Sequence, residues 1–156
     1  MDSLIKVHAA GNDFILVDGR KVDKVLPEQI RYVCHRHMGI GADGLILVKP
    51  ADGSTFQMEY FNSDGSSASM CGNGARSAVA FAHYMNFFEG ARCTFLAGDG
   101  KHVGFIEKMQ FPFYEIRVNI FWQGKVIPVD HKAWFIHTGV PHVVCRVDDV
   151  DEIDIR

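Results

Sequence analysis

The sequence lacks any apolar run long enough to cross a membrane, and its first residues lack the pattern of a secretory signal peptide. It also lacks an excess of charge of one sign. Lys and Arg number 16 against 19 Asp and Glu, which gives a formal net charge of -3 and no evident basic face. This balance argues against nucleic acid or an anionic membrane surface as the main partner.

Cysteine is scarce, and its positions do not indicate disulfides. The four residues Cys34, Cys71, Cys93 and Cys145 lack the paired spacing of small secreted domains, so we expect a cytoplasmic protein. Apolar residues make up 47% of the sequence and charged residues 22%, a composition typical of globular proteins. A length of 156 residues is sufficient for one ordinary domain with a core.

The most informative stretch is residues 61–86, in which a strand-like segment ends in a turn rich in Asn, Asp, Gly and Ser. From Ala75 to Ala82, apolar residues cover nearly every helical face, which predicts a helix buried on all sides. Cys71 comes just before this helix. We therefore expect its thiol to lie at a helix N-terminus and to face the protein interior.

That placement has chemical consequences. The first turn of a helix has unpaired backbone N–H groups and a partial positive charge, so it stabilises a thiolate or a bound carboxylate. The glycines at Gly72 and Gly74 let a ligand approach the backbone closely. A thiolate held there is a nucleophile or a general base near neutral pH. Inert packing of a buried cysteine is the alternative that the local pattern leaves open.

Four blocks of sequence together resemble the diaminopimelate epimerases. They are residues 6–14 (KVHAAGNDF), 39–44 (GIGADG), 62–66 (NSDGS) and 70–76 (MCGNGAR), which match that family in order and spacing. The resemblance implies an isomerase that interconverts LL- and meso-2,6-diaminoheptanedioate, a precursor of lysine and of bacterial cell wall. It also implies that no pyridoxal phosphate or other cofactor takes part.

The resemblance assigns roles to individual residues. One thiolate removes the α-proton while a thiol on the opposite face returns one, and Cys71 supplies one of the two. Gly72 and Asn73 supply donors for the substrate carboxylate and the developing charge. Asn12 and Asn62 are assigned substrate contacts. From the residues alone, both would be turn asparagines whose side chains bond to the nearby backbone.

His142 is the last candidate site residue. It follows Pro141 ahead of an apolar run, where a histidine is usually a satisfied residue at a strand end. Histidine also exchanges protons near pH 7. The matching family segment ends in the same Pro-His near the catalytic thiols, so we expect a catalytic role. Two positions depart from the family: Gly44 replaces a Gln of some members, and Val140 replaces an Asn of many, so both substrate contacts are expected to be lost.

One pattern resembles a metal site. Residues 27–38 predict a helix that begins at Pro27 and places Cys34 and His37 on one face. A structural zinc site needs four ligands, and no companion pair has suitable spacing. We expect core packing at Cys34 and no metal.

A second pattern matches the dinucleotide-binding fingerprint. Gly39, Gly41 and Gly44 have the spacing G-x-G-x-x-G, but a predicted helix precedes them and a predicted strand follows. The fingerprint requires the reverse order, with the phosphates at the start of a helix. We expect these glycines to cap the helix and form a tight turn.

The sequence predicts an α+β fold, in which a mixed β-sheet or barrel wraps around a buried central helix. Short strands separated by turn signals are predicted at residues 4–8, 14–17, 45–48, 56–61, 91–97, 101–107, 114–121 and 133–137. The family has two similar halves of this form with the active site between them. We place a first epimerase-type domain at residues 1–112 and the start of an incomplete second, similar domain at residues 113–156.

The resemblance implies a family chain nearly twice as long, with the second catalytic cysteine in the half that is missing here. Cys93 and Cys145 lie in predicted strands without a Gly-rich helix start, so neither replaces it. We expect a truncated chain whose exposed apolar surface is covered by a second copy, in a homodimer, or by the missing half. Three functions stay open: the epimerase, a non-catalytic binding module, and a racemase of another amino acid such as proline. Asn73 and the Asn12 block favour the diaminopimelate epimerases over the proline racemases.

Overall fold

The computed structural model describes residues 4–22, 24–121, 124–138 and 141–154. The chain divides between Asn119 and Ile120 into two compact units. The boundary expected after residue 112 lies one strand earlier, in the turn between β7 (Gly100–Gln110) and β8 (Phe113–Val118). These two strands pair with each other, so β8 belongs to the sheet of the first unit.

The first unit contains an eight-stranded mixed sheet with the order β1-β2-β3-β4-β6-β7-β8, with β5 paired to β4. The remaining strands of this sheet are β1 (Leu4–Ala9), β2 (Asn12–Asp18), β3 (Gly44–Ala51), β4 (Ser54–Asn62), β5 (Ser67–Ala68) and β6 (Arg92–Ala97). Two neighbouring pairs, β2–β3 and β4–β6, are parallel. A parallel pair needs a crossover, and each crossover here contains a helix: α1 (Pro27–Cys34) or α2 (Gly72–Tyr84).

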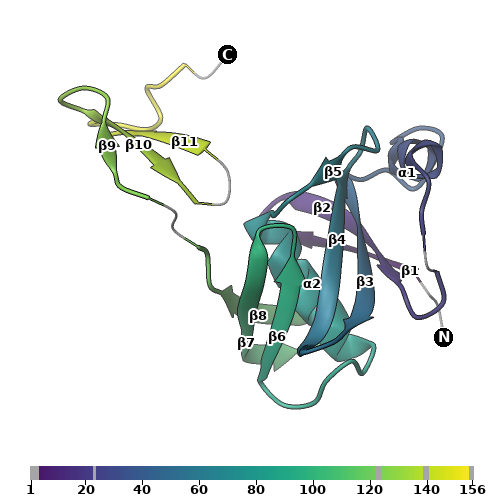
Figure 1. The fold of residues 1–156 in the computed structure, drawn as a ribbon. Helices are drawn as coiled ribbons and strands as arrows, with labels where there is room; N and C mark the ends of the chain where they lie inside the picture. The colour runs from purple at the N-terminus through teal and green to yellow at the C-terminus, as the bar shows by residue number, and fades with distance from the viewer. Residues whose placement is uncertain (1–3, 23, 122–123, 139–140, 155–156) are drawn as a thin grey trace. The chain divides into compact units, whose positions relative to one another are not determined.

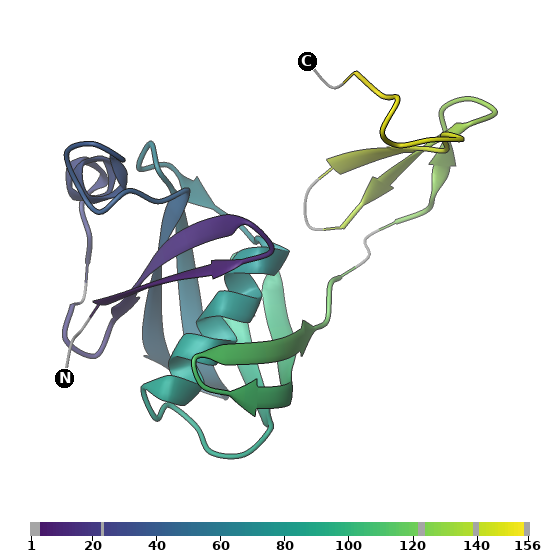
Figure 2. The ribbon, with the colours of Figure 1, turned by 180° about the vertical axis from the view of Figure 1, so that it is seen from behind.

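Helix α2 lies in the hollow of the curled sheet (Figures 1 and 2). It contacts β1, β2, β3, β4, β7 and β8. Its small residues Ala75, Ala78 and Ala82 are fully buried, so the strands approach it closely. A Cβ atom at Gly104 in β7 would lie 2.6 Å from a methyl carbon of Val79. The predicted α+β fold with a buried central helix is confirmed.

The apolar core has two parts because β2 and β3 are buried on both faces. Phe14, Leu16 and Ile46 belong to the cluster around α2. The alternate residues Ile15 and Leu45 pack instead with α1. Burial on both faces explains the unbroken apolar runs of these two parallel neighbours.

Helix α1 ends at Cys34, so the prediction that it continues to Met38 was wrong. His35 adopts an extended backbone, and its Nδ1 accepts hydrogen bonds from the backbone N–H groups of His37 (3.2 Å) and Met38 (3.1 Å). These bonds replace helical ones and turn the chain. Cys34 is 3% exposed in the cluster beside α1, as the core-packing interpretation predicted.

The glycines after α1 form a cap, as predicted. The backbone N–H of Gly39 donates to His35, and that of Gly41 donates to Val33. Gly41 has φ +78, a conformation that glycine adopts without strain. The loop then enters β3, so the order is helix, glycine turn, strand, as the rejection of a dinucleotide site required.

A groove of about 780 Å³ lies over α2 between β1 and the β7–β8 hairpin. β1 and β8 are the two end strands of the sheet, and the groove lies between them. The curled sheet is therefore not closed by pairing of β1 with β8. The exposed rings of Phe111 and Phe113 line the groove, and the Tyr84 ring stacks on Phe111 at a centroid distance of 5.8 Å.

The second unit contains a small antiparallel sheet with the order β11-β10-β9. Its strands are β9 (Ile127–Pro128), β10 (Ala133–His137) and β11 (Pro141–Cys145). Exposed apolar residues are frequent in this unit, among them Ile127, Val143 and Val150. Within the described ranges, no helix is long and apolar enough to cross a membrane.

Candidate functional site

Cys71 is the N-cap residue of α2, as the sequence predicted. Its backbone is extended, with φ -141 and ψ 120. Its Sγ accepts a hydrogen bond from the Gly74 backbone N–H at 3.4 Å, and its carbonyl accepts one from Ala75 at 2.7 Å. The thiol thus takes the capping position that a Ser, Thr or Asp oxygen usually occupies. The side chain is half-buried and packs against the core around α2.

The first turn of α2 is built for close packing. A Cβ atom at Gly74 would lie 3.1 Å from the Ile46 side chain, so glycine lets the helix start rest on β3. Gly72 and Asn73 are the first two helical residues. The first backbone N–H groups of a helix have no acceptor within it, so they are available to an anion beside Cys71.

Asn12 and Asn73, which are 61 residues apart, meet through their side chains. Asn12 follows the β1–β2 turn, in which Ala10 and Gly11 both have positive φ. The Asn73 Nδ2 donates to the Asn12 Oδ1 at 2.6 Å, and the Asn12 Nδ2 donates to the Asp43 Oδ2 at 3.0 Å. Three predicted site residues, Cys71, Asn73 and Asn12, therefore lie in one region. The Asn12 amide is not confined to its own turn.

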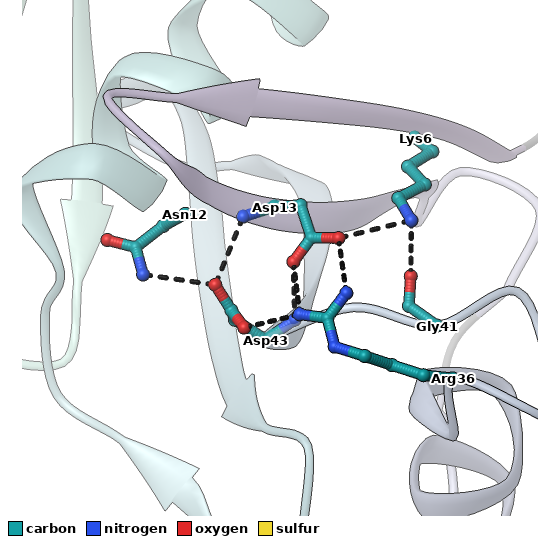
Figure 3. Close-up of polar contacts among 6 residues, drawn as sticks. All are labelled: Lys6, Asn12, Asp13, Arg36, Gly41 and Asp43. Atoms are coloured by element: carbon teal, nitrogen blue, oxygen red, sulfur yellow. Dashed lines mark hydrogen bonds and ion pairs between the residues drawn. The ribbon is translucent and has the colours of Figure 1, made fainter.

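An ionic cluster, formed by Lys6, Asp13, Arg36 and Asp43, lies next to Asn12 (Figure 3). Arg36 donates to both oxygens of Asp13, at 2.9 and 3.0 Å, and to Asp43 at 2.7 Å. Lys6 contacts Asp13 at 3.1 Å and the Gly41 carbonyl at 2.6 Å. The Asp43 backbone N–H also donates to the Asp13 carboxylate at 3.0 Å. These bonds tie the start of β2 to the loop before β3.

Charge in this cluster shifts the acidity of Asp13. Hydrogen bonds from Arg36 hold the pKa of Asp13 well below its ordinary value of 3.8, although partial burial opposes the shift. Sequence reasoning did not assign a role to Asp13, Asp43 or Arg36. The available signal was that each aspartate comes just before, or at the start of, a buried apolar strand, within a matched block.

Asn62 lies at the end of β4, where it pairs with Gly44 of β3. Its side-chain Nδ2 donates to the Ser66 Oγ at 3.1 Å, and its backbone N–H donates to the Ser66 carbonyl. The next residue, Ser63, donates its N–H to the Asp43 carbonyl. Asn62 thus acts as a turn residue beside the cluster, and its substrate contact stays a prediction.

The packing around Gly44 leaves no room for a side chain at this position. A Cβ atom there would lie 2.5 Å from the Phe61 carbonyl oxygen and 2.7 Å from the Tyr60 ring. Tyr60 packs against the same cluster as Cys71, and burial raises its pKa to about 12. In this chain a tyrosine ring fills space next to position 44.

His142 lies in β11 of the second unit, where it is exposed and pairs with Ile136. The contacts that join Cys71, Asn73 and Asn12 are all within the first unit, so a shared role of His142 with Cys71 stays a prediction. Val140 lies outside the described residues.

Comparison with known proteins decides the family. The family model described as diaminopimelate epimerase matches residues 4–107. The chain belongs to the diaminopimelate epimerase family. A diaminopimelate epimerase of Campylobacter lari is 40% identical, over 97% of this chain and 59% of its own length. One from Aquifex aeolicus is 39% identical, over 96% and 59%. The chain thus spans about three fifths of the length of these curated relatives.

Solved structures share the fold of this diaminopimelate epimerase family member at low identity. A Bacillus anthracis phenazine biosynthesis protein of the PhzF family has a TM-score of 0.65 at 17% identity, over 97% of this chain and 58% of its own. A hydroxyproline epimerase from Agrobacterium vitis, with bound trans-4-hydroxy-L-proline, has a TM-score of 0.65 at 11% identity, over 91% and 50%. At these identities the likeness shows the fold alone.

The packing around Gly44 predicts that a Gln at this position, which the resemblance gives to some family members, will destabilise this chain. We expect Gly44→Gln to lower the free energy of unfolding by about 2 kcal/mol, as overpacking a buried site does. Gly44→Ala adds the same Cβ atom without the rest of the side chain, so it should lower the free energy of unfolding by most of the same amount of about 2 kcal/mol. Urea unfolding measures both. A neutral Gly44→Ala would contradict the steric account.

The ionic cluster predicts a pH dependence of stability. Because the folded-state pKa of Asp13 is lowered, its carboxylate stabilises the fold above the ordinary value of 3.8, and this contribution is lost as the pH falls below that value. The difference in unfolding free energy between the natural chain and Asp13→Asn should therefore shrink between about pH 5 and about pH 2. Unfolding curves across this range measure it. A constant difference would show that Asp13 ionisation does not support the fold.

Proposed function

We propose that this chain supplies the Cys71 half of a cofactor-independent epimerase that acts at the α-carbon of 2,6-diaminoheptanedioate. The observation that carries the proposal is the Cys71 thiol at the N-cap of α2, with Gly72 and Asn73 directly after it and the Asn12 amide bonded to Asn73. A base stands beside donors suited to a carboxylate. Membership of the diaminopimelate epimerase family supports the choice of substrate.

The proposed reaction balances as two proton transfers. The Cys71 thiolate takes the α-proton, and the electron pair of the C–H bond becomes the carbanion, whose charge spreads onto the α-carboxylate. Donors fixed at the start of α2 stabilise that charge without reorganising. An acid on the opposite face then gives a proton to the α-carbon, which inverts the centre. Asn62 lies beside Asp43 and is assigned a substrate contact, and His142 is assigned proton exchange in the second unit.

A non-catalytic binding module is the second candidate. The observation that favours it is that the donors described here stand beside one thiol, that of Cys71, in the first unit. Such a module would bind the substrate carboxylate without turnover. The racemase alternative draws on structures at 11% identity and has less support.

The setting and the assembly are further parts of the proposal. All four cysteines are free thiols, which fits the reducing cytoplasm. The second unit exposes Ile127, Val143 and Val144. Apolar residues gathered on a small sheet favour association, so we propose that a second copy, in a homodimer, or a further chain segment covers them.

Exchange of the α-proton in deuterated water tests the proposal. The chain is incubated with LL-diaminoheptanedioate, and deuterium at the α-carbon and the LL to meso ratio are both followed. We expect deuterium incorporation that Cys71→Ala abolishes and that Cys145→Ala, which removes an exposed thiol, leaves intact. Incorporation with inversion means that a second acid is present; incorporation without inversion means that Cys71 acts alone. Binding without any exchange would establish the binding module in place of the enzyme.

A further inference from the structure

Three hydrogen bonds and one ion pair form a continuous chain across the candidate site. The Arg76 Nη2 donates to the Asn73 Oδ1, and the Asn73 Nδ2 donates to the Asn12 Oδ1 at 2.6 Å. The Asn12 Nδ2 donates to the Asp43 Oδ2 at 3.0 Å, and the other oxygen of Asp43 accepts from Arg36 at 2.7 Å. The chain links α2, β2 and the loop before β3 (Figure 3 shows the end at Asp43).

The two ends of this chain give it one direction. A guanidinium can only donate hydrogen bonds, and an ionised carboxylate can only accept them. An amide can do both, and its oxygen and nitrogen have nearly the same shape. With Arg76 at one end and Asp43 at the other, Asn73 must turn its oxygen to Arg76, and Asn12 must turn its nitrogen to Asp43. Reversing both amides would set oxygen against carboxylate and N–H against guanidinium.

Resting on the proposed function, we infer that Arg76 and Asp43 are positioning residues that orient the Asn12 and Asn73 amides for a substrate carboxylate. Each amide nitrogen carries two N–H groups, and the hydrogen bonds from Arg76 to Asp43 use one N–H of each amide. Among the residues that the structure describes, no acceptor takes the second N–H of Asn12 or of Asn73, so both can donate to an incoming ligand. Together with the backbone N–H groups at the start of α2, they form a surface of donors next to Cys71.

The negative charge of Asp43 is compensated by neighbouring cations, so it does not prevent an anionic ligand from binding. A carboxylate such as Asp43 would repel a substrate carboxylate if it stood alone. Arg36 bonds to both Asp43 and Asp13, and Lys6 bonds to Asp13. Two cations thus compensate two anions. Asp43 can set the direction of the amides while the site still accepts an anionic ligand.

The orientation of the amides is tested first without any ligand. We expect the side-chain N–H₂ resonances of Asn12 and Asn73 to be dispersed and single in the natural chain, because each amide has one fixed partner. Arg76→Met removes the terminal donor at similar length and leaves the Asn73 oxygen without this partner, so the Asn73 resonance pair should shift or split, while Asp43 still fixes Asn12 and its pair should change less. Arg76→Lys retains a donor and should keep the Asn73 pair near its original position. Unchanged amide resonances in Arg76→Met would overturn the inference, whatever the function of the site.

Binding then tests whether Arg76 acts through Asn73. If Arg76→Met leaves the Asn73 amide misoriented, the hydrogen bond from Asn73 to the charged substrate carboxylate is lost. Loss of such a bond raises a dissociation constant by about tenfold to a hundredfold, and calorimetry with LL-diaminoheptanedioate measures this change. If Arg76 acts only by orienting Asn73, the double variant Arg76→Met, Asn73→Ala should bind no more weakly than Asn73→Ala alone. Additive losses would show that Arg76 contacts the ligand itself and would overturn a positioning role.

Asp43, at the acceptor end of this series of hydrogen bonds, provides an independent check. Asp43→Asn replaces the carboxylate by an amide of the same shape, which can donate as well as accept, so only Arg76 still imposes the direction. We expect the Asn12 resonances to shift and binding to weaken, with no further loss when Asn12→Ala is added. Circular dichroism identifies a variant that fails to fold, in which case the Arg76 variants decide. If the natural chain does not bind the substrate, the proposed function fails, while the ligand-free resonances still decide the orientation.

Discussion

Burial of α2 on nearly all of its faces is the constraint on which the first unit depends. A helix that contacts six strands of one sheet can neither slide nor rotate without opening the core. Its small residues allow the sheet to curl closely around it, and Gly104 and Gly74 provide room where side chains approach most closely. The N-terminus of α2 is therefore held in place, and Cys71 with it. The position of the Cys71 thiol is thus set by the packing of the helix that carries it.

The ionic cluster fixes the other part of the site, around Asn12. Asp13 lies at the start of β2, Asp43 comes just before its parallel neighbour β3, and Arg36 comes from the turn after α1, so one guanidinium joins β2 to the residues that lead into β3. Asn12 donates to Asp43 at one side of the cluster, and its amide oxygen accepts from Asn73 at the first turn of α2. Packing fixes one side of the site and charge fixes the other. The two meet at the Asn12–Asn73 hydrogen bond.

The sequence predicted the central helix and the place of Cys71 well, because a run of alanines after a glycine turn carries that information locally. It failed at the end of α1, since the His35 side chain bonds to the following backbone and propensity does not show this. Asp13, Arg36 and Asp43 were missed because their roles depend on the parallel pairing of β2 with β3. The same limit explains the domain boundary: the period of β8 was visible, but its pairing with β7 was not.

The central claim is that a substrate carboxylate binds at the start of α2 beside Cys71. Chemical-shift mapping with an isotope-labelled chain and unlabelled LL-diaminoheptanedioate tests it most directly. We expect the largest changes at the backbone N–H groups of Gly72 and Asn73 and at the side-chain amide of Asn12. Largest changes in the groove between β1 and the β7–β8 hairpin, around Phe113 and Tyr84, would contradict it.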